Sequence, residues 1–289
     1  FTAGTPCFKF AASVAGDPLG YAKVSEIRFQ DANSTGARGI EFAYLIYANE
    51  FSNINFDGFT ASCIYTTDRA TVKISEQILF QNIICNPGNI TITEPPFDLF
   101  RINESLMTNC KLFGKQYAAT PYASVELLKV DRPQGFSIIG NSFANTKASA
   151  IKIHVSSASK AQYFAIEDNT FEDIDVATVI DVQGFNSSNK GIYGRIGKNR
   201  YNEITSPAIN INNWTGLSIS DYLPAIVLGT NTNLCHAKTL AFGATGVTNT
   251  GADNLVEEIG EDTFIFRGED AATQYIDINP RFGVMDVHI

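Results

Sequence analysis

The sequence contains few charged residues, very little methionine and no long apolar stretch. Charged side chains make up 18% of the 289 residues, and there are 2 methionines and 1 tryptophan. A charge content this low is unusual for a helical globular protein but ordinary for one rich in β-strands. No run of about 18 apolar residues occurs, so we expect no membrane span.

Cysteine, histidine and positive charge are also too scarce or too scattered for several classes of site. The five cysteines lie at irregular spacing without a C-x-x-C, and the three histidines are far apart. This pattern favours reduced, partly buried thiols, and it predicts neither a metal site nor a cofactor. The formal net charge of −9 argues against nucleic acid as a partner, because its backbone needs a basic face.

What the sequence does contain is a recurring phrase. The nine-residue pattern I-x-x-N-x-[FY]-x-[DEN]-I occurs without gaps at 46–54, 166–174 and 196–204. Degraded copies, anchored on Phe80, Met107 and Phe143, lie between the first and the second. The successive spacings of the anchors, by subtraction of positions, are 29, 27, 36, 28 and 30 residues. A loose period near 28 residues is typical of a solenoid.

Each period holds short runs in which apolar and polar residues alternate, such as SAIKIHV (149–155) and FAIEDNTF (164–171). Alternation with period 2 indicates strands, and no helical spacing of apolar residues is found between residues 40 and 215. The sequence therefore predicts an all-β chain that forms a right-handed parallel β-helix of about six to seven coils, stacked at about 4.8 Å.

The recurring asparagines and aromatics are interpreted as structural. An asparagine at a bend tolerates left-handed backbone, and asparagines stacked on one another can form an amide ladder. We expect this role for Asn49, Asn141, Asn169 and Asn199. The recurring aromatics are expected to form one buried stack: Phe51, Phe80, Phe143, Phe171 and Tyr201.

We divide the chain into three parts. Residues 1–38 are expected to lead into and cap the first coil, and residues 39–229 to form the β-helix, with an excursion at 113–124. Residues 230–289 are expected to be a β-rich region that covers the open end and joins subunits. Because the chain begins FTAGTPCFKF, without an initiator methionine, we interpret it as a fragment or a processed product.

The strand after the bend offers a column of outward-facing residues. Reading apolar-x-apolar triplets as in-out-in gives Glu41, Thr91, Glu126, Lys152, Asp181 and Asn210. Two residues further along each strand lie Thr93, His154, Gln183 and Asn212. Polar residues are expected on any solvated sheet face, so the column by itself does not establish a site.

The coil pattern F-x-I-x-x-N-x-F, followed by a G/A-I-x-I strand, resembles the pectate-lyase-like β-helix superfamily. A non-repetitive start, a body of coils and a β-rich end are most similar to a bacteriophage tailspike, over about residues 25–225. The resemblance implies a homotrimer on a virion tail, or otherwise extracellular. It also implies that the chain binds and cleaves a bacterial surface polysaccharide, which is a capsule, an O-antigen or an exopolysaccharide.

On this basis we predict hydrolysis with Glu126 and Asp181 as the acid/base pair. Two coils apart in one column, they lie about 9.6 Å from each other, at the upper edge of the roughly 6.5–9.5 Å of an inverting mechanism. Lys152 between them favours their ionised forms, which suits the base better than the acid. His154 either orients the sugar or is the base of a polysaccharide lyase, in which Lys152 neutralises a uronate.

Further substrate contacts are expected from Lys152, Glu41, Gln183, Asn210 and Trp214. For Trp214, stacking on a sugar competes with a buried contact at the end of the ladder. The competing functions are a non-catalytic carbohydrate-binding receptor or adhesin, and a purely structural fibre segment. Release of reducing ends distinguishes the enzyme from both, and binding without cleavage distinguishes the receptor from the fibre.

Overall fold

A computed structural model of the chain describes most residues up to 237 and four short strands, or parts of strands, beyond. The described residues are 3–11, 19–33, 35–43, 46–67, 75–88, 90–115, 123–156, 162–176, 178–204, 207–221, 225–230, 232–237, 247–249, 255–256, 264–268 and 274–278. Within these ranges every regular element is a strand, and no helix is long and apolar enough to cross a membrane.

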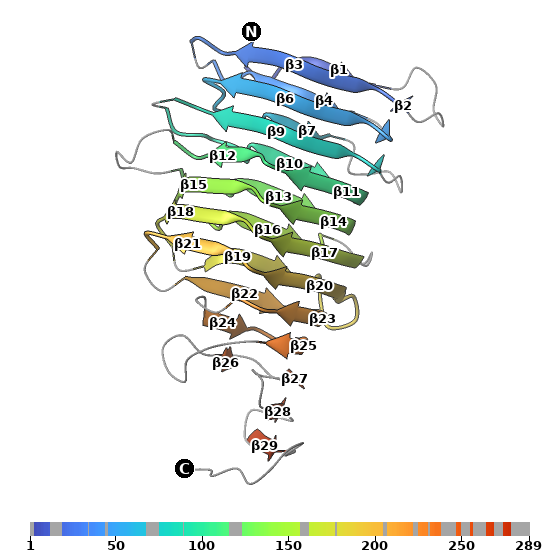
Figure 1. Cartoon of the computed structure of the whole chain (residues 1–289), viewed down its shortest axis with the longest axis vertical. Helices are drawn as coiled ribbons and strands as arrows, with labels where there is room; N and C mark the ends of the chain where they lie inside the picture. Colours follow the sequence, from blue (N-terminus) through green and yellow to red (C-terminus); the bar gives the residue numbers. More distant parts are fainter. Residues whose placement is uncertain are drawn as a thin grey trace.

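One wall of the molecule is a parallel sheet of ten strands, here called sheet A (Figure 1). Its strands, in spatial order, are β1 (Pro6–Phe10), β4 (Arg38–Phe42), β7 (Ile64–Thr66), β10 (Phe97–Phe100), β13 (Leu128–Asp131), β16 (Ile151–His154), β19 (Thr178–Gln183), β22 (Ala208–Asn212), β24 (Ala225–Leu228) and β26 (Val247–Asn249). The chain leaves sheet A after each strand and returns one rung further along. The predicted all-β fold, a parallel β-solenoid, is confirmed.

Two further walls complete each turn. The second wall holds the first halves of β3 (Lys23–Gln30), β6 (Glu50–Asp57) and β9 (Leu79–Asn86), and then β11 (Ile102–Thr108), β14 (Gln134–Ile139), β17 (Gln162–Glu167), β20 (Gly191–Gly197), β23 (Trp214–Ile219) and β25 (Asn233–Ala237). The third wall holds the second halves of β3, β6 and β9, and then β12 (Lys111–Phe113), β15 (Ser142–Thr146), β18 (Thr170–Ile174) and β21 (Arg200–Asn202). The short strands β2 (Leu19–Gly20), β5 (Ile46–Tyr47) and β8 (Ser75–Glu76) precede the second wall.

An asparagine ladder runs along the corner between the second and third walls. The side-chain oxygen of Asn141 accepts a hydrogen bond from the Cys110 amide at 2.9 Å, and the Asn141 side chain donates to Asn169 at 3.0 Å. Asn169 donates to Asn199 in the same way, and Asn199 donates to Asp221. The ladder predicted for these three asparagines is confirmed. Asn49 is structural too, but it lies at a different corner, where it binds the backbone of Ala22 and Tyr47.

The aromatic residues form two stacks, and the predicted single column is wrong in its middle. In the second wall Phe51 packs on Phe80 at 5.7 Å, and the same column continues through Met107 to Ile138. In the third wall Phe171 lies between Phe143 and Tyr201, at 5.5 and 5.3 Å. The register pairs Phe143 with Leu112 and not with Met107.

The recurring phrase thus shifts from one corner of the coil to the next between Met107 and Phe143. The spacing of 36 residues across this point reflects that shift, because Cys110 and Asn141, which occupy successive rungs, are 31 residues apart. The excursion expected at 113–124 falls largely on residues 116–122, which lie outside the described residues.

Parallel pairing extends beyond both ends of the expected 39–229 range. Strands β1 and β3 already pair with β4 and β6, so a coil precedes residue 39. At the other end β26 pairs in parallel with β24, and β27 (Leu255–Val256) with β25. Antiparallel pairing begins with β28 (Phe264–Gly268) and β29 (Gln274–Ile278). That residues 230–289 cap the stack and join subunits stays a prediction.

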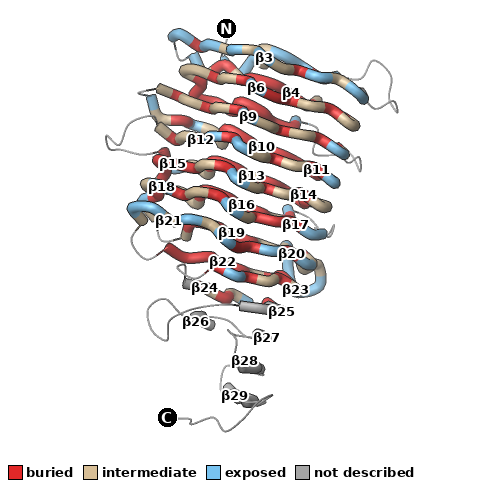
Figure 2. Tube along the Cα trace, in the orientation of Figure 1, coloured by how far each residue is buried: buried red, intermediate tan, exposed pale blue. Residues whose placement is uncertain are grey.

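The interior is apolar along the whole stack, and buried and exposed positions alternate along the strands (Figure 2). Cys63, Cys85 and Cys110 belong to this core, and no described cysteine forms a disulfide. Burial raises the pKa of the Cys110 thiol to about 12, so it stays protonated at neutral pH. Among the described cysteines, the predicted reduced thiols are what the structure shows.

Candidate functional site on the outer face of sheet A

The register of sheet A fixes which outward side chains follow one another. The main outward column is Lys9, Glu41, Tyr65, Asp98, Lys129, Lys152, Asp181 and Asn210. Four of these match the sequence alignment, but the places given to Thr91 and Glu126 belong to Asp98 and Lys129. The apolar-x-apolar triplets at 90–92 and 125–127 precede the strands, which begin at Phe97 and Leu128.

Glu126 nevertheless reaches the column through its side chain. Its Oε1 lies 3.2 Å from Lys152 Nζ, and the same ammonium nitrogen lies 3.9 Å from Asp181 Oδ2. The two carboxylate oxygens can therefore be no more than about 7 Å apart, which is closer than the alignment predicted. The side chains of Glu126, Lys152 and Asp181 are between 15 and 31% exposed, so solvent and ligand reach all three.

Amide side chains hold Asp181 from two further sides. Gln183 donates to Asp181 Oδ1 at 2.7 Å, and Asn210 donates to the same oxygen at 3.0 Å. The structure thus brings five of the predicted site residues together on adjacent rungs, with Lys152 at the centre. Because each of them stands on or beside a strand and is bonded to a neighbour, the group is held before any ligand binds.

His154 lies in the next outward column, beside Asp131. Its Nδ1 donates to the carbonyl oxygen of Val130 at 3.3 Å, and its Nε2 is 4.0 Å from Asp131 Oδ2. Burial lowers the pKa of His154; the charge of Asp131 opposes this, and that of Lys129 reinforces it. The imidazole is therefore neutral at neutral pH and can act as a base.

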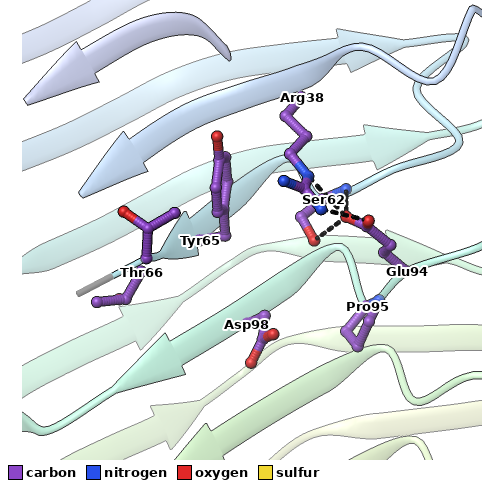
Figure 3. A pocket seen from close by; sticks show the side chains of 8 residues that line it. Arg38, Ser62, Tyr65, Thr66, Glu94, Pro95 and Asp98 are labelled. Carbon is purple, nitrogen blue, oxygen red and sulfur yellow. Dashed lines mark hydrogen bonds and ion pairs between the residues drawn. The ribbon is translucent and has the colours of Figure 1, made fainter. Parts of the chain in front are cut away.

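A hollow of about 390 Å³ opens on the same face, nearer the start of the chain (Figure 3). It is lined by Arg38, Ser62, Tyr65, Thr66, Thr67, Glu94, Pro95 and Asp98. The backbone pairing of Asp98 with Lys129, and of Lys129 with Lys152, connects the hollow to the Glu126–Lys152–Asp181 group across two rungs. At about 4.8 Å a rung, the two features are about 10 Å apart along the stack.

An ion pair forms the wall of this hollow. Arg38 Nε donates to Glu94 Oε2 at 2.9 Å, and a second guanidinium nitrogen donates to Glu94 Oε1. Ser62 adds its amide and its hydroxyl to the same carboxylate, and Arg38 also lies 5.0 Å above the Tyr65 ring. Burial acts to raise the pKa of Glu94, but the hydrogen bonds and charge of Arg38 outweigh it, so the pKa is lowered and the carboxylate stays ionised.

Two predicted substrate contacts do not fit the structure. Trp214 is completely buried, its indole nitrogen donates to the Tyr193 carbonyl, and its ring packs edge-on against Phe164 at 5.3 Å. Stacking of Trp214 on a sugar is therefore ruled out, and the buried contact is the correct alternative. Glu41 is only 6% exposed and accepts hydrogen bonds from Tyr65 and Thr67, so it supports the face from beneath.

Sequence reasoning missed the hollow. Arg38 and Glu94 are 56 residues apart, and only the register of the coils brings them together. The one available signal was the cluster of polar residues in SCIYTT (62–67), a stretch whose alignment was ambiguous. Among the described residues, no group of three or more histidine, cysteine or acidic side chains could hold a metal ion.

The chain matches none of the protein-family models, curated proteins or solved structures with which it was compared. The likeness to β-helix proteins therefore rests on the fold alone. A parallel β-solenoid is compatible with the binding or cleavage of polysaccharides, but a fold does not fix a function. The function has to be argued from the outer face of sheet A.

Proposed function

We propose that the chain binds a bacterial surface polysaccharide along the outer face of sheet A and hydrolyses it at Glu126 and Asp181. The observation that carries the proposal is the convergence of these two carboxylates on the single ammonium group of Lys152. The rigid row of charged and amide side chains on successive rungs supports it, because a linear polymer can contact such a row at several points.

The two carboxylates suit different roles. Asp181 is contacted by Lys152, Gln183 and Asn210, which fix the position of its oxygens, so it suits the base or the nucleophile. Glu126 stands before the strand with Lys152 as its contact, and can turn towards the glycosidic oxygen as the acid. A separation of up to about 7 Å includes the retaining distance of about 5–5.5 Å and the lower end of the inverting range.

The first prediction is that Glu126→Gln and Asp181→Asn each lower the rate of polysaccharide cleavage by at least about 100-fold while binding persists, since general acid–base groups contribute about 10²–10⁴-fold. Release of reducing ends is measured on a panel of capsule, O-antigen and exopolysaccharide preparations. Glu167→Gln is the matched control, because Glu167 is a partly exposed carboxylate in an ion pair on the second wall. Wild-type rates in both test variants contradict the assignment.

A lyase is the second candidate, and the neutral imidazole of His154 favours it. In that reaction His154 removes the proton next to a uronate carboxylate, and Lys152, on the neighbouring column of the same strand, neutralises the carboxylate. The product is unsaturated and absorbs in the near ultraviolet, which distinguishes it from a hydrolysis product. A wild-type chain that binds a glycan and forms neither product is a receptor or adhesin without catalysis.

We also propose that the chain works as a homotrimer at the tail of a virion or otherwise outside the cell, with residues 230–289 contributing to assembly. The support is the break in the sequence pattern near residue 230 and the similarity of its organisation to tailspikes. Symmetric assembly is the usual way in which a protein covers a flat outer wall.

A further inference from the structure

Two tyrosines stand exposed on successive coils, outside the site described above. Tyr193 is 61% exposed and Tyr163 is 37% exposed. The pairing of β17 with β20 places them on neighbouring rungs of the second wall. Both belong to the corner at which the chain has left a strand of sheet A and enters the second wall, near the right-hand edge of Figure 1.

This corner requires left-handed backbone in coil after coil. The residues that occupy it, in register, are Tyr21, Ala48, Gln77, Glu104, Gly135, Tyr163, Tyr193 and Gly216, and all have positive φ. Glycine and asparagine adopt this conformation at least cost, and a bulky residue there is an outlier. Two tyrosines in succession, with a glycine on each side, are therefore not explained by the demands of the backbone.

The structure holds Tyr193 in place. Its carbonyl accepts the hydrogen bond of the buried Trp214 indole at 3.1 Å, and its ring lies so close to Gly216 that a Cβ at that position would come within 2.6 Å of it. The absence of a side chain at Gly216 thus leaves room for the ring. An aromatic side chain that is fixed but exposed loses little entropy when it contacts a ligand.

The corner is continuous with the end of sheet A that carries His154 and Gln183. Strand β16 ends at His154, and β17 with Tyr163 is the next strand; β19 ends at Gln183, and β20 with Tyr193 is the next. A polymer that crosses the outer face at these rungs meets the tyrosines when it passes round the corner. The apolar face of a sugar ring can pack on an aromatic ring while its hydroxyl groups stay in water.

We propose that Tyr163 and Tyr193 form an aromatic platform that holds a sugar ring of the glycan bound on sheet A. The inference rests on the proposed function and deepens it, because it adds a second contact region around the corner from the carboxylates. The chemistry selects pyranose rings with an exposed apolar face, whichever polysaccharide supplies them.

The test uses Tyr163→Asn and Tyr193→Asn in the full chain, because asparagine tolerates the left-handed conformation. Affinity is measured by calorimetry with the preparation that the wild-type chain binds best. Each variant is expected to bind about three- to tenfold more weakly, with an unchanged or higher melting temperature. Tyr193→Phe keeps the ring and should retain the affinity. Tyr21→Asn is the matched control, since Tyr21 is 83% exposed in the same corner of the first coil.

The outcomes separate this inference from the proposed function. If the wild-type chain binds a glycan and both asparagine variants bind it equally well, the platform is wrong and the proposed function stands. Weaker binding accompanied by a lowered melting temperature, not rescued by Tyr193→Phe, also overturns the platform, because it shows a structural role. If the wild-type chain binds none of the glycans, both proposals fail together.

Discussion

Asp221 is the residue at which the buried ladder departs from its own pattern. It stands one rung beyond Asn199, is 2% exposed, and accepts hydrogen bonds from the Asn199 side chain and from the Tyr201 hydroxyl, the latter at 2.6 Å. Burial raises the pKa of Asp221, and the hydrogen bonds from Tyr201 and Asn199 offset part of the rise. A carboxylate in this position therefore stabilises the fold less when it is ionised than when it is protonated.

We predict that Asp221→Asn raises the free energy of unfolding at pH 7 by on the order of 1 kcal/mol, since one unit of pKa shift corresponds to about 1.4 kcal/mol. The pKa is raised in the folded state, so the destabilising contribution of Asp221 is absent below its unfolded pKa and grows as the pH rises through the folded value. The gain should disappear in urea unfolding near pH 3.5. Asn169→Asp, which places a carboxylate within the ladder, should destabilise at pH 7.

At the scale of the strands, the stack of rings in the third wall stabilises the contacts between coils. Phe171 is fully buried between Phe143 and Tyr201, and its strand β18 pairs with β15 and β21. Each coil contributes one ring, and no coil can bury that ring without its neighbours. Removal of a ring in the middle therefore weakens the contact on both sides.

We predict that Phe171→Ala lowers the free energy of unfolding by about 3–5 kcal/mol, through lost burial and the cavity that remains. Denaturant unfolding followed by circular dichroism measures it. Phe185→Ala is the control, because Phe185 is 45% exposed in a loop and should change stability by less than about 0.5 kcal/mol. A loss below about 1 kcal/mol at Phe171 contradicts the role of the stack.

At the scale of the whole molecule, the outer face of sheet A has to stay open to solvent if a glycan binds there. Any assembly must therefore use other surfaces. The second and third walls are available among the described residues, and the proposed trimer would place them between subunits.

We predict that light scattering of the chain gives three times the 31.5 kDa mass of one chain, and that binding of the glycan leaves this mass unchanged. A shortened chain ending at residue 229 tests the contribution of residues 230–289, and it should be monomeric if this region joins the subunits. Its circular dichroism must stay that of a β-protein for the comparison to count. A monomer mass for the full chain contradicts the trimer.

The sequence predicted part of the candidate site correctly for an identifiable reason. Lys152, Asp181 and Asn210 lie on strands whose apolar neighbours alternate without interruption, so their outward direction could be inferred. For Glu126 the same rule failed in register, because Val125 and Leu127 flank it before the strand begins. It still reached Lys152, because a glutamate side chain is long enough to cross from the turn to the column.

By itself, the sequence determined the kind of fold. Period-2 alternation, a spacing near 28 residues and asparagine at the bends are local and repeated, so they survive the variation of any single coil. Only the tertiary structure decided which side chains share a rung. Coil length varies from 22 residues between Asn199 and Asp221 to 31 between Cys110 and Asn141, and a shift of one residue along a strand exchanges its two faces. The hollow at Arg38 and Glu94, the buried position of Trp214 and the exposed pair Tyr163 and Tyr193 all depend on that register.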